Sequence, residues 1–226
     1  MPDQGINRRT FLKVTTVAGT GMLVGCSFQS NPLVSTPDVK SEELGLFVRI
    51  SKDNNITIIS PTSEIGQGTH TAHAMIIAEE LDADWENINV VTTNNINSEY
   101  NTDSWGVYTG GNRGIRFWWD RLRVIGAGTR ELLVTAGAQK MDVPLKECTA
   151  QNGHVVHLPS GRQLSFGELA LIASKLEPSS NPRLKSEENF RFVGKPMRRV
   201  DIPKKVNGSA IYSSDIRLPG MLYAAV

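Results

Sequence analysis

Residues 64–85, EIGQGTHTAHAMIIAEELDADW, are the stretch around which the rest of this chain is expected to fold. The stretch opens with Gly66, Gln67 and Gly68 and continues at once into a helical pattern. Its apolar residues recur at the spacing of one helix face, and they are Ala74, Ile77, Ala78, Leu81 and Trp85. His73, Glu80 and Asp84 fall off that face. The pattern predicts a glycine-rich turn followed by an amphipathic helix with one buried side.

The glycine turn before this helix allows two interpretations. Glycines at a helix start let backbone N–H groups approach an anion, and the helix dipole favours negative charge there. Thr69 or Thr71 can cap the same end of the helix. Many such turns, however, simply end a strand. Taken alone, the turn favours this second, purely structural interpretation.

Length, charge and cysteine content exclude several classes of protein. The 226 residues suffice for one or two domains with a proper core. With 24 Lys and Arg against 23 Asp and Glu, the chain has no electrostatic basis for binding nucleic acid or a membrane surface. Cys26 and Cys148 are the only cysteines, which excludes a disulfide framework and a multi-cysteine zinc or iron–sulfur site in this chain.

The N-terminus has the pattern of an export signal. Arg8 and Arg9 precede Phe-Leu-Lys and a mildly apolar segment, residues 14–25, as in twin-arginine signals. The Leu-Val-Gly-Cys that ends at Cys26 resembles a lipobox, which predicts a periplasmic protein held at the membrane only through its signal or a lipid on Cys26. Cleavage nearby by signal peptidase, with Cys26 discarded, is the alternative. Residues 27–43, rich in Ser, Pro and Asn, are expected to form a flexible tether.

Short strands are expected on both sides of the central helix. Residues 46–50 and 56–60 flank Lys-Asp-Asn-Asn and predict a hairpin. Residues 88–92 alternate as a further strand, and an Asn-rich surface loop is expected over residues 94–104. A second hairpin is predicted at Asn152-Gly153.

The later part of the chain offers structural signals but no metal ligands. Residues 165–168, Ser-Phe-Gly-Glu, form a capping box that predicts a helix as far as Leu176. His154 and His157 fall on opposite faces of a strand, which argues against a metal pair. Cys148 is interpreted as a small buried residue in a strand.

A second glycine pair, Thr109-Gly110-Gly111, precedes a long helical pattern. The residues that can share its apolar face are Trp118, Leu122, Ile125, Leu132, Leu133 and Ala136. The rest of the helix carries Arg113, Arg116, Arg121, Arg123 and Arg130. Because acidic residues are interleaved, we interpret these arginines as a solvated face or an anion site at the helix start. Gly126 and Gly128 indicate close packing against a neighbour.

These motifs together resemble the molybdenum-binding large subunit of the molybdenum hydroxylases, the xanthine dehydrogenase and aldehyde oxidase family. Within that family they resemble the branch of the isoquinoline 1-oxidoreductase beta subunit. The resemblance is carried by residues 64–71 and 78–85, by Thr109-Gly110-Gly111 with the Arg-rich helix, and by residues 193–208 and 218–224. It covers residues 44–226 together with the export signal, and its motifs occur in the family's order. The resemblance reverses the structural interpretation of the glycine turn.

The resemblance implies an oxidoreductase that hydroxylates N-heteroaromatic compounds or aldehydes with oxygen from water. It implies a molybdopterin cytosine dinucleotide cofactor with molybdenum, and iron–sulfur clusters on a small partner subunit. Electrons would pass from that subunit to a cytochrome-type acceptor. A small-molecule substrate, and no nucleic acid, is the expected ligand.

The resemblance also implies roles for particular residues. Gln67 would be the catalytic residue, hydrogen-bonded to an oxo ligand of molybdenum. The cofactor-binding residues would be Gly66, Gln67, Gly68, Thr69, Thr109, Gly110 and Gly111. The chain departs from the family pattern at Asn112 and Gly114, where the branch often has serines, which puts a hydroxyl contact to the cofactor there in doubt. No residue of this chain is expected to be a direct metal ligand.

The fold expected is α+β, with short sheets flanked by helices. The predicted divisions are a signal with lipobox (1–26), a tether (27–43), the N-terminal part of a molybdopterin-binding domain (44–177), a linker (178–190) and the start of a hammerhead-like second domain (191–226). Family members are several hundred residues long, and their glutamate base lies in a part that the present sequence does not contain. We therefore expect the missing C-terminal half in the same or another chain, and no activity from this chain alone. The alternative is a truncated or degenerate exported lipoprotein without catalytic activity.

Overall fold

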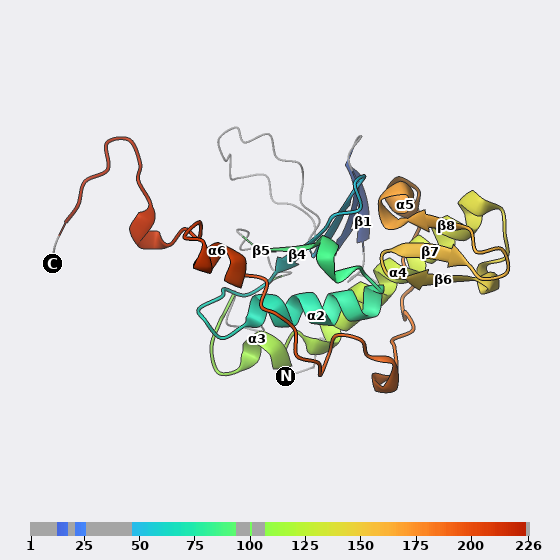
Figure 1. Cartoon of the computed structure of the whole chain (residues 1–226), viewed down its shortest axis with the longest axis horizontal. Coiled ribbons are helices and arrows are strands. Elements are labelled where there is room, and N and C mark those ends of the chain that lie inside the picture. The colour runs from blue at the N-terminus through green and yellow to red at the C-terminus, as the bar shows by residue number, and fades with distance from the viewer. Residues whose placement is uncertain (1–12, 18–20, 26–46, 94–99, 101–106, 225–226) are drawn as a thin grey trace, which may run out of the picture.

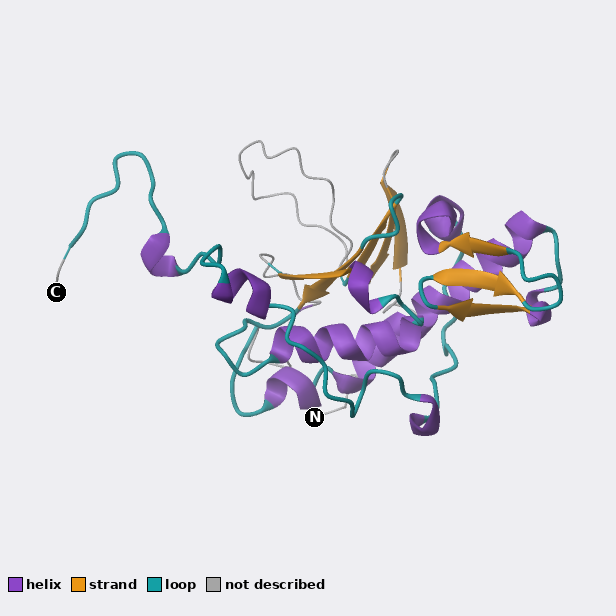
Figure 2. Cartoon of the chain, in the orientation of Figure 1, coloured by secondary structure: helices purple, strands orange, loops and turns teal. Residues whose placement is uncertain are grey.

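The computed structural model describes residues 13–17, 21–25, 47–93, 100 and 107–224 (Figure 1). Two sheets, one of five strands and one of three, are combined with helices in a mixed architecture (Figure 2). The α+β class predicted from the sequence is confirmed. Figure 1 shows the larger sheet lying over two long helices, α2 (Thr69–Leu81) and α4 (Trp119–Met141).

The predicted first hairpin is confirmed. Strands β3 (Val48–Ser51) and β4 (Ile56–Ser60) pair antiparallel, with Val48 opposite Ile58. Their turn passes through Asn54 at a φ of 63°, a left-handed conformation that asparagine tolerates. The side chains of β3 alternate between buried and half-buried, which matches the period of two in the sequence, whereas Ile58, Ile59 and Ser60 of β4 are all buried.

The helix α2 returns the chain to the same sheet. A single 3₁₀ turn, η1 (Trp85–Asn87), follows α2, and strand β5 (Ile88–Thr92) then pairs parallel to β4. The strand was predicted, but its parallel pairing was not, because a local pattern does not show which strand lies beside it. The predicted loop over residues 94–104 lies outside the described residues except for Tyr100, whose ring centroid is 5.1 Å from that of Phe47.

The other edge of the larger sheet comes from the segment predicted to be an export signal. Strands β1 (Lys13–Val17) and β2 (Gly21–Gly25) pair with each other, and β2 pairs antiparallel with β3. The sequence pattern did not predict strands here. Arg8, Arg9 and Cys26, together with the tether, lie outside the described residues, so export and lipidation stay predictions.

The predicted apolar face of α2 is buried, with the exception of Trp85, which is half-buried. His73 and Glu80, which lie off that face, are buried as well, each with an exposed fraction of 0%. The helix packs against the sheet on one side and against α4 on another. More of its surface is therefore buried than the one apolar face in the sequence indicates. Gly126 makes this contact possible: a Cβ added there would lie 2.8 Å from the carbonyl oxygen of Ile77.

The smaller sheet extends the fold beyond the C-terminal half of α4. The short helices α3 (Arg113–Arg116) and η4 (Leu145–Glu147) flank α4. Strands β6 (Cys148–Gln151), β7 (His154–His157) and β8 (Gln163–Ser165) then form an antiparallel meander. Asn152 and Gly153 have φ values of 48° and 76°, which confirms the predicted hairpin.

Helix α5 (Phe166–Ala173) begins with the predicted capping box, in which Ser165 and Glu168 bond each other's backbone amides. The helix ends at Ala173, earlier than predicted, because residues 174–176 continue as a turn. Two turns of the chain meet at its start. The side chain of Asn54 accepts a hydrogen bond from the amide of Gly167 (3.0 Å) and donates one to the carbonyl of Gly153 (3.2 Å).

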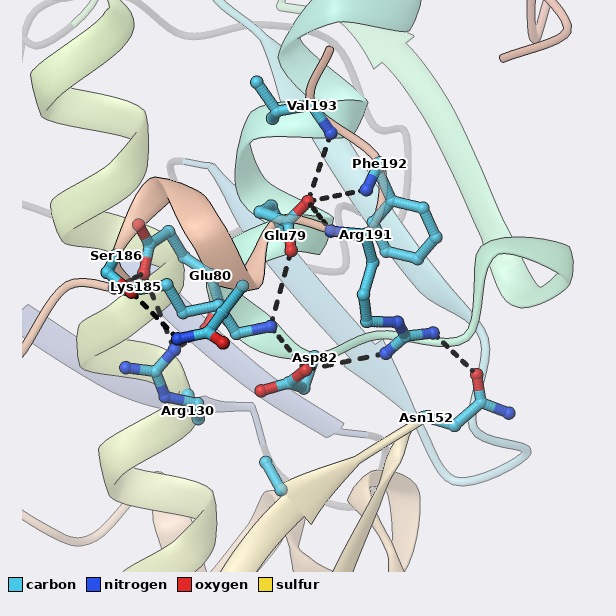
Figure 3. Close-up of polar contacts among 12 residues, drawn as sticks. Glu79, Glu80, Asp82, Arg130, Asn152, Lys185, Ser186, Arg191, Phe192 and Val193 are labelled. Carbon is cyan, nitrogen blue, oxygen red and sulfur yellow. Dashed lines mark hydrogen bonds and ion pairs between the residues drawn. The ribbon is translucent and has the colours of Figure 1, made fainter. Parts of the chain in front are cut away.

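Residues 183–193, called here the return segment, run back along α2 and α4. The stretch predicted to be a linker, residues 178–190, includes most of this segment, and the only regular element in it is the 3₁₀ turn η5 (Glu187–Asn189). Figure 3 shows that the segment is bound by two consecutive carboxylates of α2, Glu79 and Glu80. The linker expectation therefore overlooked extensive contacts, while the predicted division into domains stays a prediction.

Glu79 holds the return segment through its backbone. One carboxylate oxygen of Glu79 accepts hydrogen bonds from the amides of Arg191 (2.8 Å), Phe192 (2.6 Å) and Val193 (3.1 Å). Its other oxygen lies 3.4 Å from Lys185 Nζ. Burial alone would raise the pKa of Glu79, but these amides and the Lys185 charge outweigh burial and hold the pKa below its usual value.

Glu80 is held by the arginines of α4. Its carboxylate accepts from Arg123 Nε (2.7 Å) and from the amide of Lys185 (2.9 Å), and Arg130 Nη1 lies 3.5 Å away. Arg123 and Arg130 also donate to carbonyl oxygens of the return segment. The expectation that these two arginines belong to a solvated face was therefore wrong, since they neutralise a buried charge.

The chain then passes through helix α6 (Ile202–Val206) and the 3₁₀ turn η6 (Ser213–Asp215). Figure 1 shows the segment after α6 extending away from the two sheets. Residues 221–224 form no strand within the described part of the chain. Across the described residues, no helix combines the length and apolar character needed to cross a membrane.

Replacement of Glu79 by glutamine tests the role of the buried carboxylate. Glu79→Gln leaves three amides with a weaker acceptor and Lys185 with one partner fewer, so we expect a loss of about 3 kcal/mol of unfolding free energy. Thermal unfolding should then shift down by about 6–12 °C. Glu86→Gln, at an exposed glutamate of the same region, is the matched control and should change stability by less than about 0.5 kcal/mol. Equal effects of the two changes would contradict the assignment.

Candidate functional site

The first glycine turn, residues 66–68, lies between strand β4 and the start of α2. Gly66 and Gly68 have φ values of 105° and 89°, in the region that favours glycine. Nothing lies within 4 Å of the position that a Cβ would take at either glycine. The backbone of this turn therefore faces open space, and a flat group could approach it closely.

Glu64 occupies the N-terminus of α2. Its Oε1 accepts from the amides of Gly66 (2.8 Å) and Gly68 (2.9 Å), and its Oε2 accepts from the amide of His70 (3.1 Å). Burial would raise the pKa of Glu64, but these amides and the Arg199 charge outweigh it and lower the pKa. The anion at this helix start is thus the protein's own carboxylate.

This arrangement corrects one expectation from the sequence. Thr69 or Thr71 was expected to cap α2, but the N-cap residue is Gly68. Glu64 accepts hydrogen bonds from the amides of Gly68 and His70 at this helix start, and the cofactor-binding role expected of Thr69 stays a prediction. The signal for Glu64 was present in the sequence as an acidic residue just before a helix start.

The side chain of Gln67 is bound within its own turn. Its Nε2 donates to the carbonyl of Ser63 (2.9 Å) and to Thr69 Oγ1 (3.1 Å), while its Oε1 accepts from the amide of Ile65 (2.6 Å). The residue as a whole is exposed. Gln67 therefore shapes the turn in this conformation, and it must release at least one of these bonds to reach another ligand.

The second glycine turn, residues 109–111, lies beside the first. Thr109 Oγ1 accepts a hydrogen bond from the amide of Ser63 (3.0 Å), which joins the two turns across 46 residues of sequence. Gly111 has a φ of 54° and open space at its Cβ position, whereas a Cβ at Gly110 would lie 2.6 Å from the Tyr108 hydroxyl. The structure thus brings the predicted cofactor-binding residues of both turns together, and their role stays a prediction.

The chain behind these turns explains one departure from the family pattern. A Cβ at Gly114 would lie 2.9 Å from Thr69 Cγ2, so a serine there would require Thr69 to shift. The carbonyl of Gly114 accepts from His73 Nε2 (2.5 Å), and Ser60 Oγ lies 2.9 Å from His73 Nδ1. Burial lowers the pKa of His73 to about 4, so its imidazole is neutral at pH 7.

Arg199 was missed by sequence reasoning. Its Nη1 donates to the carbonyl of Gly66 (2.8 Å), and its Nη2 lies 3.3 Å from Glu64 Oε1. The same guanidinium forms a two-pronged ion pair with Asp201, at 2.9 and 2.6 Å. No local pattern around Arg199 could show that it reaches a turn far earlier in the chain.

A pocket of about 400 Å³ lies elsewhere, between α4, β6 and the return segment. Its lining includes Asp82, Arg130, Cys148, Thr149 and Lys185. Arg130 and Lys185 are already paired with carboxylates, and the glycine turns do not contribute to the lining. Burial raises the pKa of the half-buried Cys148 thiol, which keeps it protonated at neutral pH. We do not assign the cofactor to this pocket.

Comparison with known proteins identifies a family. The sequence profile described as "Molybdopterin cofactor-binding domain" matches residues 7–212. The isoquinoline 1-oxidoreductase beta chain of Brevundimonas diminuta is 34% identical over 98% of this chain and 33% of its own length. A nicotinate dehydrogenase subunit of Pseudomonas putida is 31% identical over 84% of this chain and 16% of its own length.

A membrane-bound aldehyde dehydrogenase of Gluconacetobacter polyoxogenes, whose name specifies pyrroloquinoline quinone, is 33% identical over 96% of this chain and 29% of its own length. The chain thus spans a third or less of these relatives. Among solved structures, quinoline 2-oxidoreductase of Pseudomonas putida 86 aligns with a TM-score of 0.43 and 19% identity, over 55% of this chain and 15% of that one.

The buried imidazole of His73 predicts a pH dependence of stability. Because its folded pKa is about 4 and its ordinary value 6.5, an unfolded chain takes up a proton between these values that the folded chain does not. The contribution of His73 to the unfolding free energy is therefore fully present above pH 6.5. It falls as the pH decreases toward 4, by up to about 1.4 kcal/mol per pH unit. Burial lowers the pKa of His70 as well, so that residue adds to the same slope.

Chemical denaturation between pH 7.5 and 5 measures this slope, above the usual titration range of carboxylates. His73→Gln should be less stable at pH 7.5 but should flatten the slope. His154→Gln, at the first residue of β7, is the matched control and should keep the wild-type slope. A His73→Gln slope equal to that of the wild type would show that His73 does not carry this dependence.

Proposed function

The chain belongs to the molybdopterin cofactor-binding domain family, and we propose that it is the N-terminal portion of an exported molybdenum-dependent oxidoreductase subunit. The observation that supports this proposal most strongly is the pair of glycine turns joined by the Ser63–Thr109 hydrogen bond, with open space above Gly66, Gly68 and Gly111. Such a backbone surface suits a flat pterin, since no side chain keeps it at a distance. The proposed cofactor is the cytosine dinucleotide form.

The residues of this chain would bind and orient that cofactor. Gly66, Gly68 and Gly111 would let it approach the backbone, and Gln67 would offer its amide once a bond to Ser63 or Ile65 is released. Glu64 would keep the turn rigid from behind rather than touch the cofactor. When bound, the cofactor would supply a Lewis-acidic metal that can accept two electrons.

The proposed reaction is hydroxylation of an electron-poor carbon in an N-heteroaromatic compound or an aldehyde. The C–H bond breaks, a C–O bond to a water-derived oxygen forms, and two protons and two electrons are released. The electrons would pass to iron–sulfur clusters on a small partner subunit and then to a cytochrome-type acceptor. The names of two relatives, an isoquinoline oxidoreductase and a nicotinate dehydrogenase, support the heteroaromatic class. The general base would come from a part of the subunit outside this sequence.

Location of the protein is part of the proposal. Arg8 and Arg9 would direct export by the twin-arginine route, and Cys26 would carry the lipid that holds the mature protein at the periplasmic face of the membrane. Intact mass of the protein from the membrane fraction tests this: a chain beginning at Cys26 with added acyl mass is expected, and processing there would remove strands β1 and β2 from the larger sheet. A chain that retains Arg8 and Arg9 would contradict processing.

A degenerate exported lipoprotein without activity is the second candidate. It is favoured by the Gln67 amide, which is bound at both ends within its own turn, and by Glu64, which fills the helix start. Asn112 and Gly114 point the same way, since neither offers the hydroxyl found in many relatives. The two candidates differ in whether the completed subunit carries molybdenum.

Molybdenum and cytidine nucleotide analysis of the complete subunit decides between them. The subunit should be produced with its iron–sulfur partner in a molybdate-supplied host, and we expect molybdenum and cytidine monophosphate in equal amounts. Gln67→Ala should then lower turnover by about 10- to 100-fold, as loss of a group that orients a metal ligand does. Gln139→Ala, at an exposed glutamine of α4, is the control and should leave turnover unchanged. A wild-type subunit free of molybdenum would exclude the first candidate.

A further inference from the structure

The Arg199 guanidinium holds the first glycine turn from outside the turn itself. It donates to the carbonyl of Gly66 at 2.8 Å, although the two residues are 133 positions apart in the sequence. It also lies 3.3 Å from Glu64 Oε1, the oxygen that accepts from the amides of Gly66 and Gly68. One planar group therefore contacts both the backbone of the turn and the carboxylate that organises it.

The neighbours of Arg199 fix its orientation. Asp201 binds two of its nitrogens in the fork geometry that guanidinium and carboxylate share. Lys205 Nζ lies 2.6 Å from Asp201 Oδ2, and it is one helical turn further along, within α6. The amide of Val200, between Arg199 and Asp201, donates to Thr71 Oγ1 in the first turns of α2 (3.1 Å). Residues 199–201 thus lie across the start of α2. The Arg199 side chain contacts the glycine turn, and the Val200 amide is bonded to α2.

Hydrogen bonds hold the turn in its shape. Gly66 and Gly68 adopt left-handed conformations, and glycine loses more conformational freedom on ordering than any other residue. Ser63, Ile65 and Gln67 are exposed, and the Gln67 side chain bonds Ser63, Ile65 and Thr69 within the turn. Its shape depends on hydrogen bonds, and those of Glu64 and Arg199 are the ones with a full charge.

We propose that Arg199 is a positioning residue, which fixes the first glycine turn in the shape that the cofactor would contact. This inference rests on the function proposed above. Arg199 acts through Glu64 and the Gly66 carbonyl rather than on the cofactor. The turn that would hold the cofactor is then complete only after residues 199–201 have docked across the start of α2.

Amide hydrogen exchange of the whole chain, measured by NMR, tests this role directly. In Arg199→Gln, the amides of Ile65, Gly66, Gly68 and His70 should exchange about tenfold faster, the effect of losing one partly exposed ionic hydrogen bond. The amides of α4 should keep their wild-type rates. Arg198→Gln, at the neighbouring exposed arginine, is the matched control and should leave the turn unchanged.

The conservative variant separates positioning from general stability. Arg199→Lys keeps the charge near Glu64, but a lysine cannot bind Asp201 with a fork and the Gly66 carbonyl together, so exchange at the turn should fall between wild type and Arg199→Gln. Unchanged exchange in Arg199→Gln would overturn the inference. So would an equal acceleration in the turn and in α4, or an equal effect of Arg198→Gln.

Molybdenum content of the complete subunit distinguishes this inference from the proposed function. The wild-type subunit should retain molybdenum through gel filtration, and Arg199→Gln should lose about tenfold in retention, since residues that orient a binding group act on this scale. A wild-type subunit without molybdenum would overturn the proposed function, whatever the exchange rates. Molybdenum in the wild type with unchanged turn exchange in Arg199→Gln would overturn the role of Arg199 alone.

Discussion

Glu79 and Glu80 are consecutive carboxylates with exposed fractions of 1% and 0%, and buried charges of like sign need compensation from every side. Three backbone amides and Lys185 compensate Glu79, while Arg123, Arg130 and a further amide compensate Glu80. Most of these partners come from the return segment, and the two arginines come from α4. The pair therefore forces three parts of the chain, distant in sequence, to lie together.

The same helix is constrained at both ends by later parts of the chain. Near its C-terminal end, Glu79, Glu80 and Asp82 bind the return segment, and near its start Arg199 binds Glu64 and Gly66. Residues 183–201 thus run along α2 from its C-terminal end to the glycine turn. The fold and the candidate site depend on the same stretch of chain. A substitution in the return segment can therefore change the first glycine turn although the substituted residue does not contact that turn.

Features encoded by neighbouring residues were predictable, and features that depend on distant partners were not. The β3–β4 hairpin, the Asn152-Gly153 turn and the Ser165–Glu168 capping box follow from local preferences, and all are confirmed. The parallel pairing of β5, the charge compensation of Glu80 and the reach of Arg199 could not be read locally. The motif that includes Glu79 and Glu80 is typical of the family, but its physical role depends on the return segment, which lies more than 100 residues later in the chain.

The glycine turn illustrates the limit for the site. Its position before α2 was predicted, but an acidic side chain rather than an external anion occupies the helix start, and only the geometry of Glu64 shows this. Buried carboxylates hold the return segment against α2, and exchange of the Arg191, Phe192 and Val193 amides in the wild-type chain tests this contact most directly. The structure predicts slow exchange at all three, comparable to that of amides within α2. Exchange at the rate of an unstructured peptide would contradict it.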